Sequence, residues 1–270
     1  MAETFKGVQD FVDESGAAVD VTLAYTALWD LVDELRVKVE KRFAVTRDPS
    51  TERFEDYRGD DGQGGGPRGT IRGYSGPEID WMIHSWIANP TASFTNIHLT
   101  IWLGPQVKVP HFGLAFGTFP AVWCYLDSVP RSDLMVDLEH LDTYYEPVND
   151  EHLDIRARPG LNAFVSRGLY VRQSLSETAH CFSCDDVDLA LTTVRDLAHR
   201  HLDRWLQWVD EAAPTDPADR PDLAARDEAI RRNVAERDPA NVMGVRYFGE
   251  ELTADLVRTL WGGDRVLPRP

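Results

Sequence analysis

Side chains that could bind a ligand and move protons fall on one face of three predicted neighbouring strands. The segment 93–127 contains the stretches SFTNIHLTIWLG, HFGLAFGTF and AVWCYLD. Alternate residues of a strand point to opposite sides, so one side of each stretch is mainly aliphatic. The other side carries Asn96, His98, Thr100 and Trp102 in the first strand, Gly113, Ala115 and Gly117 in the second, and Trp123, Tyr125 and Asp127 in the third.

His98 is the candidate acid–base residue of this second side, because a histidine near its ordinary pKa can release and accept a proton at neutral pH. Glycine inside a strand often marks a place where another group approaches the backbone closely. Gly113, Ala115 and Gly117 could therefore form a bare floor for a flat ligand, with Trp102, Trp123 and Tyr125 as its walls. The alternative is that a bulky helix fills this space and that His98 is an ordinary core histidine. Periodicity alone favours the alternative.

Other motifs indicate no metal centre and no tightly bound nicotinamide or flavin. Cys181 and Cys184 form one C-x-x-C pair beside His180, whereas a structural zinc site usually needs two such pairs. His199 and His201 lie two residues apart and cannot share a helix face. The sequence also contains no nucleophile elbow and no dinucleotide-binding fingerprint. The two cysteines of the pair are therefore interpreted as structural.

The elements around the three strands indicate an α+β fold in a single domain, 1–270. The turns between these strands are too short for helical crossovers, so the sheet is predicted to be antiparallel. Helices before and after a contiguous sheet are expected to pack on it. Apolar residues at helical spacing predict helices over 21–43, 185–213, 223–236 and 250–261, and a strand-like run predicts a strand over 79–87. Turn signals predict a flexible Gly-rich loop over 45–69 and a Pro-rich break over 213–221.

Composition narrows the class of protein. The chain has 270 residues, is 43% hydrophobic and carries a net charge of -17, which argues against a nucleic-acid or anionic-membrane binder. No apolar run reaches the length of about 18 residues that indicates a membrane-spanning helix. The first residues lack the pattern of a secretory signal, and three cysteines suit a reducing compartment. We expect a cytoplasmic protein, and the usage of Ala, Arg, Asp and Pro is typical of a GC-rich bacterium.

Several longer phrases resemble the ferredoxin-dependent bilin reductases, and most of all their relative, red chlorophyll catabolite reductase. The matching phrases occur in the same order and are IDWMIHSWI, VPHFGLAF, YLDSVPRSDLMVDLEHLDTYYE, FVSRGLYVRQSLSETA, RDEAIRRN and RYFGEEL. The resemblance implies a three-layer α/β/α sandwich with a central antiparallel sheet. It also implies an oxidoreductase that binds a linear tetrapyrrole between the sheet and the C-terminal helices. Such enzymes hold no tightly bound cofactor, take single electrons from reduced ferredoxin and obtain protons from side chains.

The resemblance also assigns residues, and Asp238 falls on the aspartate of the family's DPAR motif. His98 falls on a pigment-contacting histidine, whereas the family's central acid falls on Ala115 and a glutamate of one member falls on Trp86. Because alanine cannot donate a proton, the chain is either a reductase with a changed site or a binding protein or biosynthetic enzyme for another aromatic metabolite. His98 and Asp238 are the expected catalytic residues, and the expected substrate contacts are Trp86, Asn96, Thr100, Trp102, Gly113, Ala115, Trp123, Arg131, Arg172 and Asn241.

Arginines have two proposed roles in this interpretation. Guanidinium groups match carboxylates bidentately, so Arg131 and Arg172 are candidate clamps for the propionates of a tetrapyrrole. Each of the two could equally form a structural ion pair. A second group could dock an acidic ferredoxin or simply form a solvated helix face; its members are Arg226, Arg231, Arg232 and Arg246.

Overall fold

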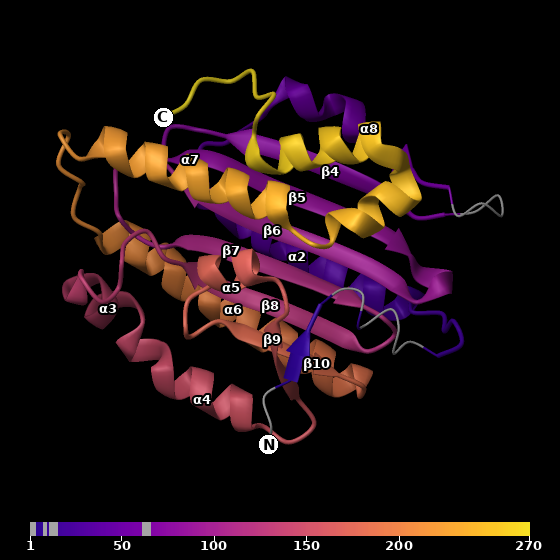
Figure 1. Cartoon of the computed structure of the whole chain (residues 1–270). Helices are drawn as coiled ribbons and strands as arrows, with labels where there is room; N and C mark the ends of the chain where they lie inside the picture. Colours follow the sequence, from indigo (N-terminus) through magenta and orange to yellow (C-terminus); the bar gives the residue numbers. More distant parts are fainter. Residues whose placement is uncertain (1–3, 8–9, 11–15, 61–65) are drawn as a thin grey trace.

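The computed structural model describes residues 4–7, 10, 16–60 and 66–270. Within these ranges a ten-stranded sheet forms the middle layer, and helices cover both of its faces (Figure 1). The predicted α/β/α sandwich is thus confirmed. The strands are β1 (Thr4–Lys6), β2 (Thr46–Arg47), β3 (Tyr57–Arg58), β4 (Arg68–Ser75), β5 (Ile79–Asn89), β6 (Phe94–Leu103), β7 (His111–Thr118), β8 (Val122–Val129), β9 (Asn162–Ser166) and β10 (His180–Cys184). The helices are α2 (Thr22–Arg42), α3 (Leu138–Tyr144), α4 (Asn149–Ala157), α5 (Leu169–Ser174), α6 (Val187–Glu211), α7 (Arg220–Arg237) and α8 (Asn241–Trp261), with short 3-10 helices η1 (Pro49–Phe54), η2 (Pro90–Ala92) and η3 (Glu146–Val148).

The sheet is antiparallel across its centre, as the short connections predicted. Its strand order is β1–β9–β10–β8–β7–β6–β5–β4–β2, and β3 pairs with β4 beside this path. The pairings from β9 to β2 are all antiparallel. The edge strand β1 instead runs parallel to β9, so the whole sheet is mixed. No helix in the described part of the chain is long and apolar enough to cross a membrane.

The aliphatic face of the sheet packs on α2 and α6, which lie behind it in Figure 1. Ile97, Leu99 and Ile101 of β6 are completely buried there. They meet a helical stripe that includes Leu35 of α2 and Leu202 of α6. Full burial of each such side chain contributes roughly 1.5–3 kcal/mol. This layer therefore holds the sheet in place and leaves the other face for α7 and α8.

The helices α7 and α8 cover the opposite face over β4, β5 and β6 (Figure 1). Leu256 of α8 packs with Ile83, and the indole N–H of Trp81 donates to the carbonyl of Thr259 over 3.1 Å. Gly249 interrupts α8 with φ 75° and ψ 170°, a conformation that essentially only glycine adopts. Helix α8 therefore consists of a first arm, 241–248, and a second arm, 250–261, joined by a sharp bend.

A buried cluster of charges ties α7 and the C-terminal tail to β5. A bulge next to Ile79 turns Asp80 away from the regular alternation of β5. The Asp80 carboxylate then pairs with Arg231 of α7 at 2.7 Å, Arg265 at 2.8 Å and Arg269 at 2.9 Å. Burial by itself raises the pKa of Asp80, but these three guanidinium groups hold it below its ordinary value. We call these four residues the Asp80 cluster.

The predicted flexible loop 45–69 contains regular elements in its described part, which corrects that expectation. Strand β2, helix η1 and strand β3 fall within it, and residues 61–65 lie outside the described residues. Phe54 and Tyr57 are buried under α8. The Asp48 carboxylate accepts hydrogen bonds from Ser50 N and from the tail residues Val266 and Leu267. Those long-range partners order a segment whose local sequence is polar. Residues 212–219 separate α6 from α7.

Candidate active site

Half-buried residues of β6, β7 and β8 form a row on the sheet face that carries α7 and α8. His98 pairs across the strands with Ala115, and Ala115 pairs with Tyr125. Thr100 pairs with Gly113 in the neighbouring row. Each of these alternates with a buried residue of the aliphatic face. We call this surface the floor, and its members are Asn96, His98, Thr100, Gly113, Ala115 and Tyr125.

The two glycines of β7 differ in how much space lies above them. A Cβ atom added to Gly113 would meet only ordinary contacts, with Val129 Cγ2 at 3.4 Å. A Cβ added to Gly117 would collide with the carbonyl oxygen of Thr95 and lie 2.5 Å from the Trp123 ring. The expected bare floor is therefore open at Gly113 and covered at Gly117. Trp123 is the residue that covers it.

His98 is in a chemically neutral form at physiological pH. Its side chain is half-buried, and burial lowers its pKa to about 4. Burial is the one cause of this shift, and no hydrogen bond from a described residue contributes to it. The imidazole therefore offers one donor and one acceptor to a molecule lying on the floor.

The Asp238 carboxyl group lies close to the opposite end of the same row. It follows α7 directly and accepts a hydrogen bond from Ala240 N at 2.8 Å. Burial raises the pKa of Asp238, which favours its protonated form. Burial also raises the pKa of Tyr125, and the nearby Asp238 carboxylate raises it further. The row thus runs from His98 through Ala115 to Tyr125 and Asp238.

The three tryptophans assigned to the site have different positions. Trp86 pairs with Ile97 and therefore faces α2, where its ring lies 5.7 Å from that of Tyr25. The expectation that Trp86 contacts the substrate is wrong for this reason. Trp102 shares the face of His98 but packs beneath α7, with the Arg231 guanidinium 5.6 Å from its ring centre. Trp123 is buried on the floor side.

Arg131 is a structural residue and not a carboxylate clamp. It is buried and pairs with Asp227 of α7 at 2.5 Å. Its remaining donors reach the carbonyl oxygens of Gly104, Val107 and Val109. Burial works against ionisation of Asp227, but His111 and Arg131 lower its pKa to about 2. The ion-pair alternative is therefore confirmed for Arg131.

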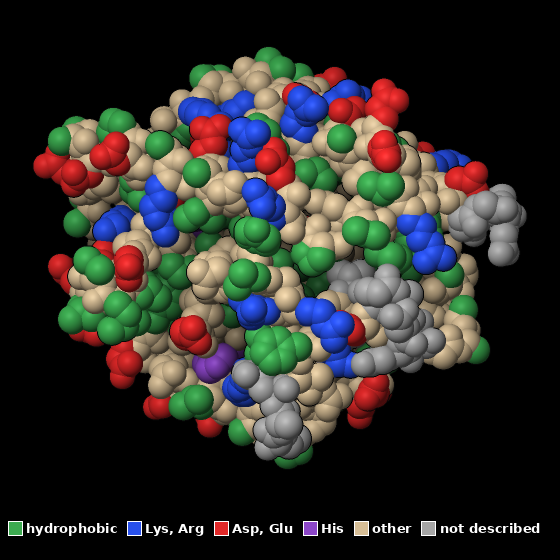
Figure 2. All heavy atoms as spheres, in the orientation of Figure 1, with side chains coloured by type: hydrophobic (Ala, Val, Ile, Leu, Met, Phe, Trp, Pro, Cys, Tyr) green, Lys and Arg blue, Asp and Glu red, His purple; other side chains and the backbone are tan. Residues whose placement is uncertain are grey.

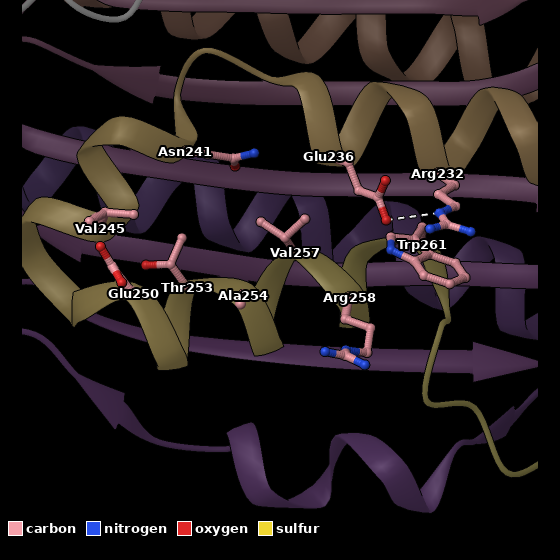
Figure 3. Close-up of a pocket in the computed structure, with 10 residues that line it drawn as sticks. All are labelled: Arg232, Glu236, Asn241, Val245, Glu250, Thr253, Ala254, Val257, Arg258 and Trp261. Atoms are coloured by element: carbon pink, nitrogen blue, oxygen red, sulfur yellow. Dashed lines mark hydrogen bonds and ion pairs between the residues drawn. The ribbon is translucent and has the colours of Figure 1, made fainter.

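Arg172 belongs to α5, and Asn241 is the first residue of α8. Arg172 of α5 donates to the carbonyl oxygens of Ser166 and Arg167 and pairs with no described carboxylate. Asn241 lines a pocket of about 450 Å³ between α7 and the two arms of α8 (Figure 3). Its amide donates to the carbonyl of Ala235. Asn241 therefore faces the pocket between α7 and α8 and does not face the floor.

The expected basic patch for an acidic partner does not form as one surface. Arg231 is buried in the Asp80 cluster, and Arg232 pairs with Glu236 at 2.8 Å. Arg226 donates to the carbonyl of Pro130, while Arg246 lies 5.8 Å from the ring of Tyr247. Basic and acidic side chains alternate over α7 and α8 in Figure 2. Contacts within the chain thus occupy the four arginines that were expected to form the basic patch.

Asp127 is a carboxyl group of the site face that the expected site residues omit. It pairs with Gly113, and its carboxylate accepts hydrogen bonds from Ser176 N at 2.8 Å and the Ser176 hydroxyl at 2.5 Å. Burial raises the pKa of Asp127 to about 6, although the Ser176 hydrogen bonds work in the other direction. Strand alternation alone could have identified it, because Asp127 lies two residues from Tyr125. Its burial could not be read from the sequence.

The raised pKa of Asp127 gives a stability prediction. Because its folded pKa of about 6 exceeds the unfolded value, the folded state binds more protons between about pH 4 and 6. The free energy of unfolding should fall by about 3 kcal/mol as the pH rises through this window. Asp127→Asn should remove this loss, measured as the difference between the urea unfolding curves of the two proteins from pH 4 to 6.5. Identical pH dependence in both would contradict the assignment.

The cysteines and the remaining histidines do not form a metal site among the described residues. No group of three His, Cys, Asp or Glu side chains there could hold a metal ion. Cys184 donates to the carbonyl of Asp186, and burial raises the pKa of Cys181. His199 pairs with Glu34, and His201 shares a hydrogen bond with Ser128 on the aliphatic face. The contacts of these residues are structural.

Comparison with known proteins places most of the chain in one family. The family model described as red chlorophyll catabolite reductase (RCC reductase) matches residues 27–261. The chain belongs to the red chlorophyll catabolite reductase family. The red chlorophyll catabolite reductase of Hordeum vulgare is 26% identical to it over 66% of this chain and 94% of that protein.

Two further relatives and one solved structure extend this comparison. The red chlorophyll catabolite reductases of Oryza sativa subsp. japonica and Arabidopsis thaliana are 27% and 28% identical over 67% of this chain, which spans only 59% and 62% of their lengths. Both names include the word chloroplastic, so the expected cytoplasmic location stays a prediction. Phytochromobilin synthase from tomato, solved with biliverdin, has a TM-score of 0.69 at 16% identity, over 87% of this chain and 82% of that one. At this identity the likeness concerns the fold.

Proposed function

We propose that this member of the red chlorophyll catabolite reductase family is an oxidoreductase that reduces a linear tetrapyrrole or a similar flat conjugated molecule. Electrons would come from reduced ferredoxin, and protons from side chains at the floor. The observation that carries the proposal is the row of small, half-buried residues with a neutral His98 at one end and the Asp238 carboxyl group near the other.

Each end of the row has a definite task in this proposal. The neutral His98 imidazole can hold a lactam carbonyl or pyrrole N–H of the pigment by a hydrogen bond. Asp238, whose raised pKa favours the carboxylic acid, can supply a proton for the reduction of the pigment. Gly113 and Ala115 add no bulk, so a planar pigment can lie against the sheet. Arg172 is the remaining candidate for a propionate contact.

A second candidate function is binding without turnover, and Ala115 is the observation that favours it. Ala115 occupies the centre of the row, where the resemblance expects an acid, and a methyl group cannot donate a proton. In this alternative the chain binds a flat aromatic metabolite and leaves it chemically unchanged. The same assay separates the two functions.

The assay follows absorbance after anaerobic mixing of the protein with biliverdin or red chlorophyll catabolite, ferredoxin, ferredoxin reductase and NADPH. We expect a shift of the absorbance bands on binding and then progressive bleaching as conjugation is lost. His98→Ala should weaken binding about tenfold, the effect of roughly one lost hydrogen bond, with an unchanged melting temperature. A shift without bleaching would favour the binding protein, and no spectral change would exclude both pigments as ligands.

A further inference from the structure

Tyr125 is one of two proton-bearing side chains that pair directly with Ala115 in the described sheet, and His98 is the other. Tyr125 pairs with Ala115, so its Cβ lies about 5 Å from the Ala115 methyl group. Its ring stands edge-on between two aromatic rings, with centroids 6.0 Å from Trp123 and 5.2 Å from Phe164. These contacts fix the direction in which the hydroxyl points.

The Tyr125 hydroxyl group also has polar neighbours from two other elements. The Ser166 hydroxyl at the end of β9 lies near enough to lower the pKa of Tyr125, against the effect of burial. The Asp238 carboxylate lies near enough to influence its ionisation. A buried tyrosine elsewhere in the fold shows the purely structural arrangement: Tyr145 donates to the carbonyl of Ser128 over 2.9 Å on the aliphatic face. Tyr125 differs because it is half-buried and borders the floor.

We propose that the Tyr125 hydroxyl is the group that delivers protons to the substrate lying over Ala115, and that Asp238 restores each proton. This inference rests on the proposed reductase function and names the acid that would act where Ala115 supplies none. Tyr125 would touch the substrate and Asp238 would act through it.

The proposed step balances with ferredoxin as the one-electron iron–sulfur reductant. Reducing one conjugated double bond takes two electrons and two protons. After each electron arrives, the O–H bond of Tyr125 breaks and a new bond to hydrogen forms on the substrate. The phenolate then recovers a proton from Asp238, which is half-exposed and regains its own from solvent. The raised pKa of Tyr125 means that only a strongly basic acceptor, such as a substrate that has gained an electron, takes its proton.

The test compares four proteins in the anaerobic absorbance assay with biliverdin, ferredoxin, its reductase and NADPH. Tyr125→Phe keeps the ring and removes the hydroxyl. The matched control is Tyr170→Phe, which removes an exposed hydroxyl that accepts a hydrogen bond from Arg237 on α7. The double variant Tyr125→Phe with Ala115→Asp returns a proton donor to the neighbouring position. Melting curves establish that each variant folds.

We expect Tyr125→Phe to bind biliverdin within twofold of the wild-type affinity and to convert it about a hundredfold more slowly, the lower end of the usual effect of a general acid. Tyr170→Phe should match the wild type, and the double variant should recover at least about tenfold of the lost rate. A folded Tyr125→Phe protein that converts at the wild-type rate would overturn the inference, and so would a folded double variant without recovery.

If the protein proves not to be a reductase, a different measurement tests the role of Tyr125. If the wild type binds biliverdin but never bleaches it, reduction is excluded and the spectrum of the bound pigment becomes the test of Tyr125. A hydroxyl that touches the pigment should move its absorbance maximum relative to Tyr125→Phe. Superimposable spectra would show that Tyr125 does not contact the ligand.

Discussion

Replacing Asp80 by asparagine is expected to lower the free energy of unfolding by about 3–5 kcal/mol, because it leaves buried guanidinium groups without their counter-charge. The side chains of Arg231 and Arg265 are only 3% and 8% exposed. Arg231 belongs to α7, and Arg265 and Arg269 belong to the C-terminal tail. Removing the Asp80 carboxylate should therefore also loosen the attachment of α7 to the sheet. Urea unfolding followed by tryptophan fluorescence measures the effect.

The matched control for this prediction removes another carboxylate that contacts the same arginine. Glu228 pairs with Arg269 at 2.6 Å, but the two side chains are 41% and 36% exposed. Glu228→Gln should therefore change the unfolding free energy by less than about 1 kcal/mol. Equal midpoints for the Asp80 and Glu228 variants would show that the Asp80 cluster contributes no more than a surface pair.

Gly113→Leu and Gly117→Ala should have opposite effects, although the glycines lie four residues apart on one face. A Cβ atom at Gly113 meets only ordinary contacts, so we expect the leucine variant to fold and its side chain to occupy the floor and remove pigment binding. Gly117→Ala places a methyl group against Thr95 and Trp123 and should cost about 1–3 kcal/mol of stability through overpacking. Melting temperature and the absorbance shift with biliverdin provide the two readouts.

This glycine pair tests the position of the binding surface without touching an ionisable group. A folded Gly113→Leu protein that binds biliverdin as tightly as the wild type would show that the pigment does not lie on the floor. An unaffected melting temperature for Gly117→Ala would show that the Trp123 ring can move away from β7. The first outcome bears on function and the second on packing alone.

The alternation of β6 was sufficient to predict which of its residues share a face. Ile97, Leu99 and Ile101 are uniformly aliphatic, so burying them leaves only one orientation for His98. Strand β5 lacks this signal because both of its sides are apolar. The sequence gives no reason to place Trp86 toward α2 and not toward the floor. A site residue can thus be assigned from alternation only where the two sides of a strand differ.

Long-range partners account for most of what the sequence could not predict. Arg131 and Asp227 are 96 residues apart, and nothing local indicates that they form a buried pair. Asp48 orders the segment around η1 through two backbone groups of the tail, 218 and 219 residues away. The register that unites His98, Ala115 and Tyr125 likewise comes from pairing between strands. Residue types therefore predicted which side chains could bind a ligand or move a proton better than they predicted which residues those side chains contact.

The bend at Gly249 separates two arms of α8 that have different contacts with the sheet. The second arm is anchored to the sheet through Leu256 and through the Trp81 hydrogen bond to Thr259. The first arm rests on aromatic contacts, such as the ring of Tyr247 stacked 6.0 Å from that of Phe94. If ligands of different width bind on the floor, we expect the first arm to shift while the second arm keeps its place. The backbone angles of Gly249 would then set how far the first arm can move.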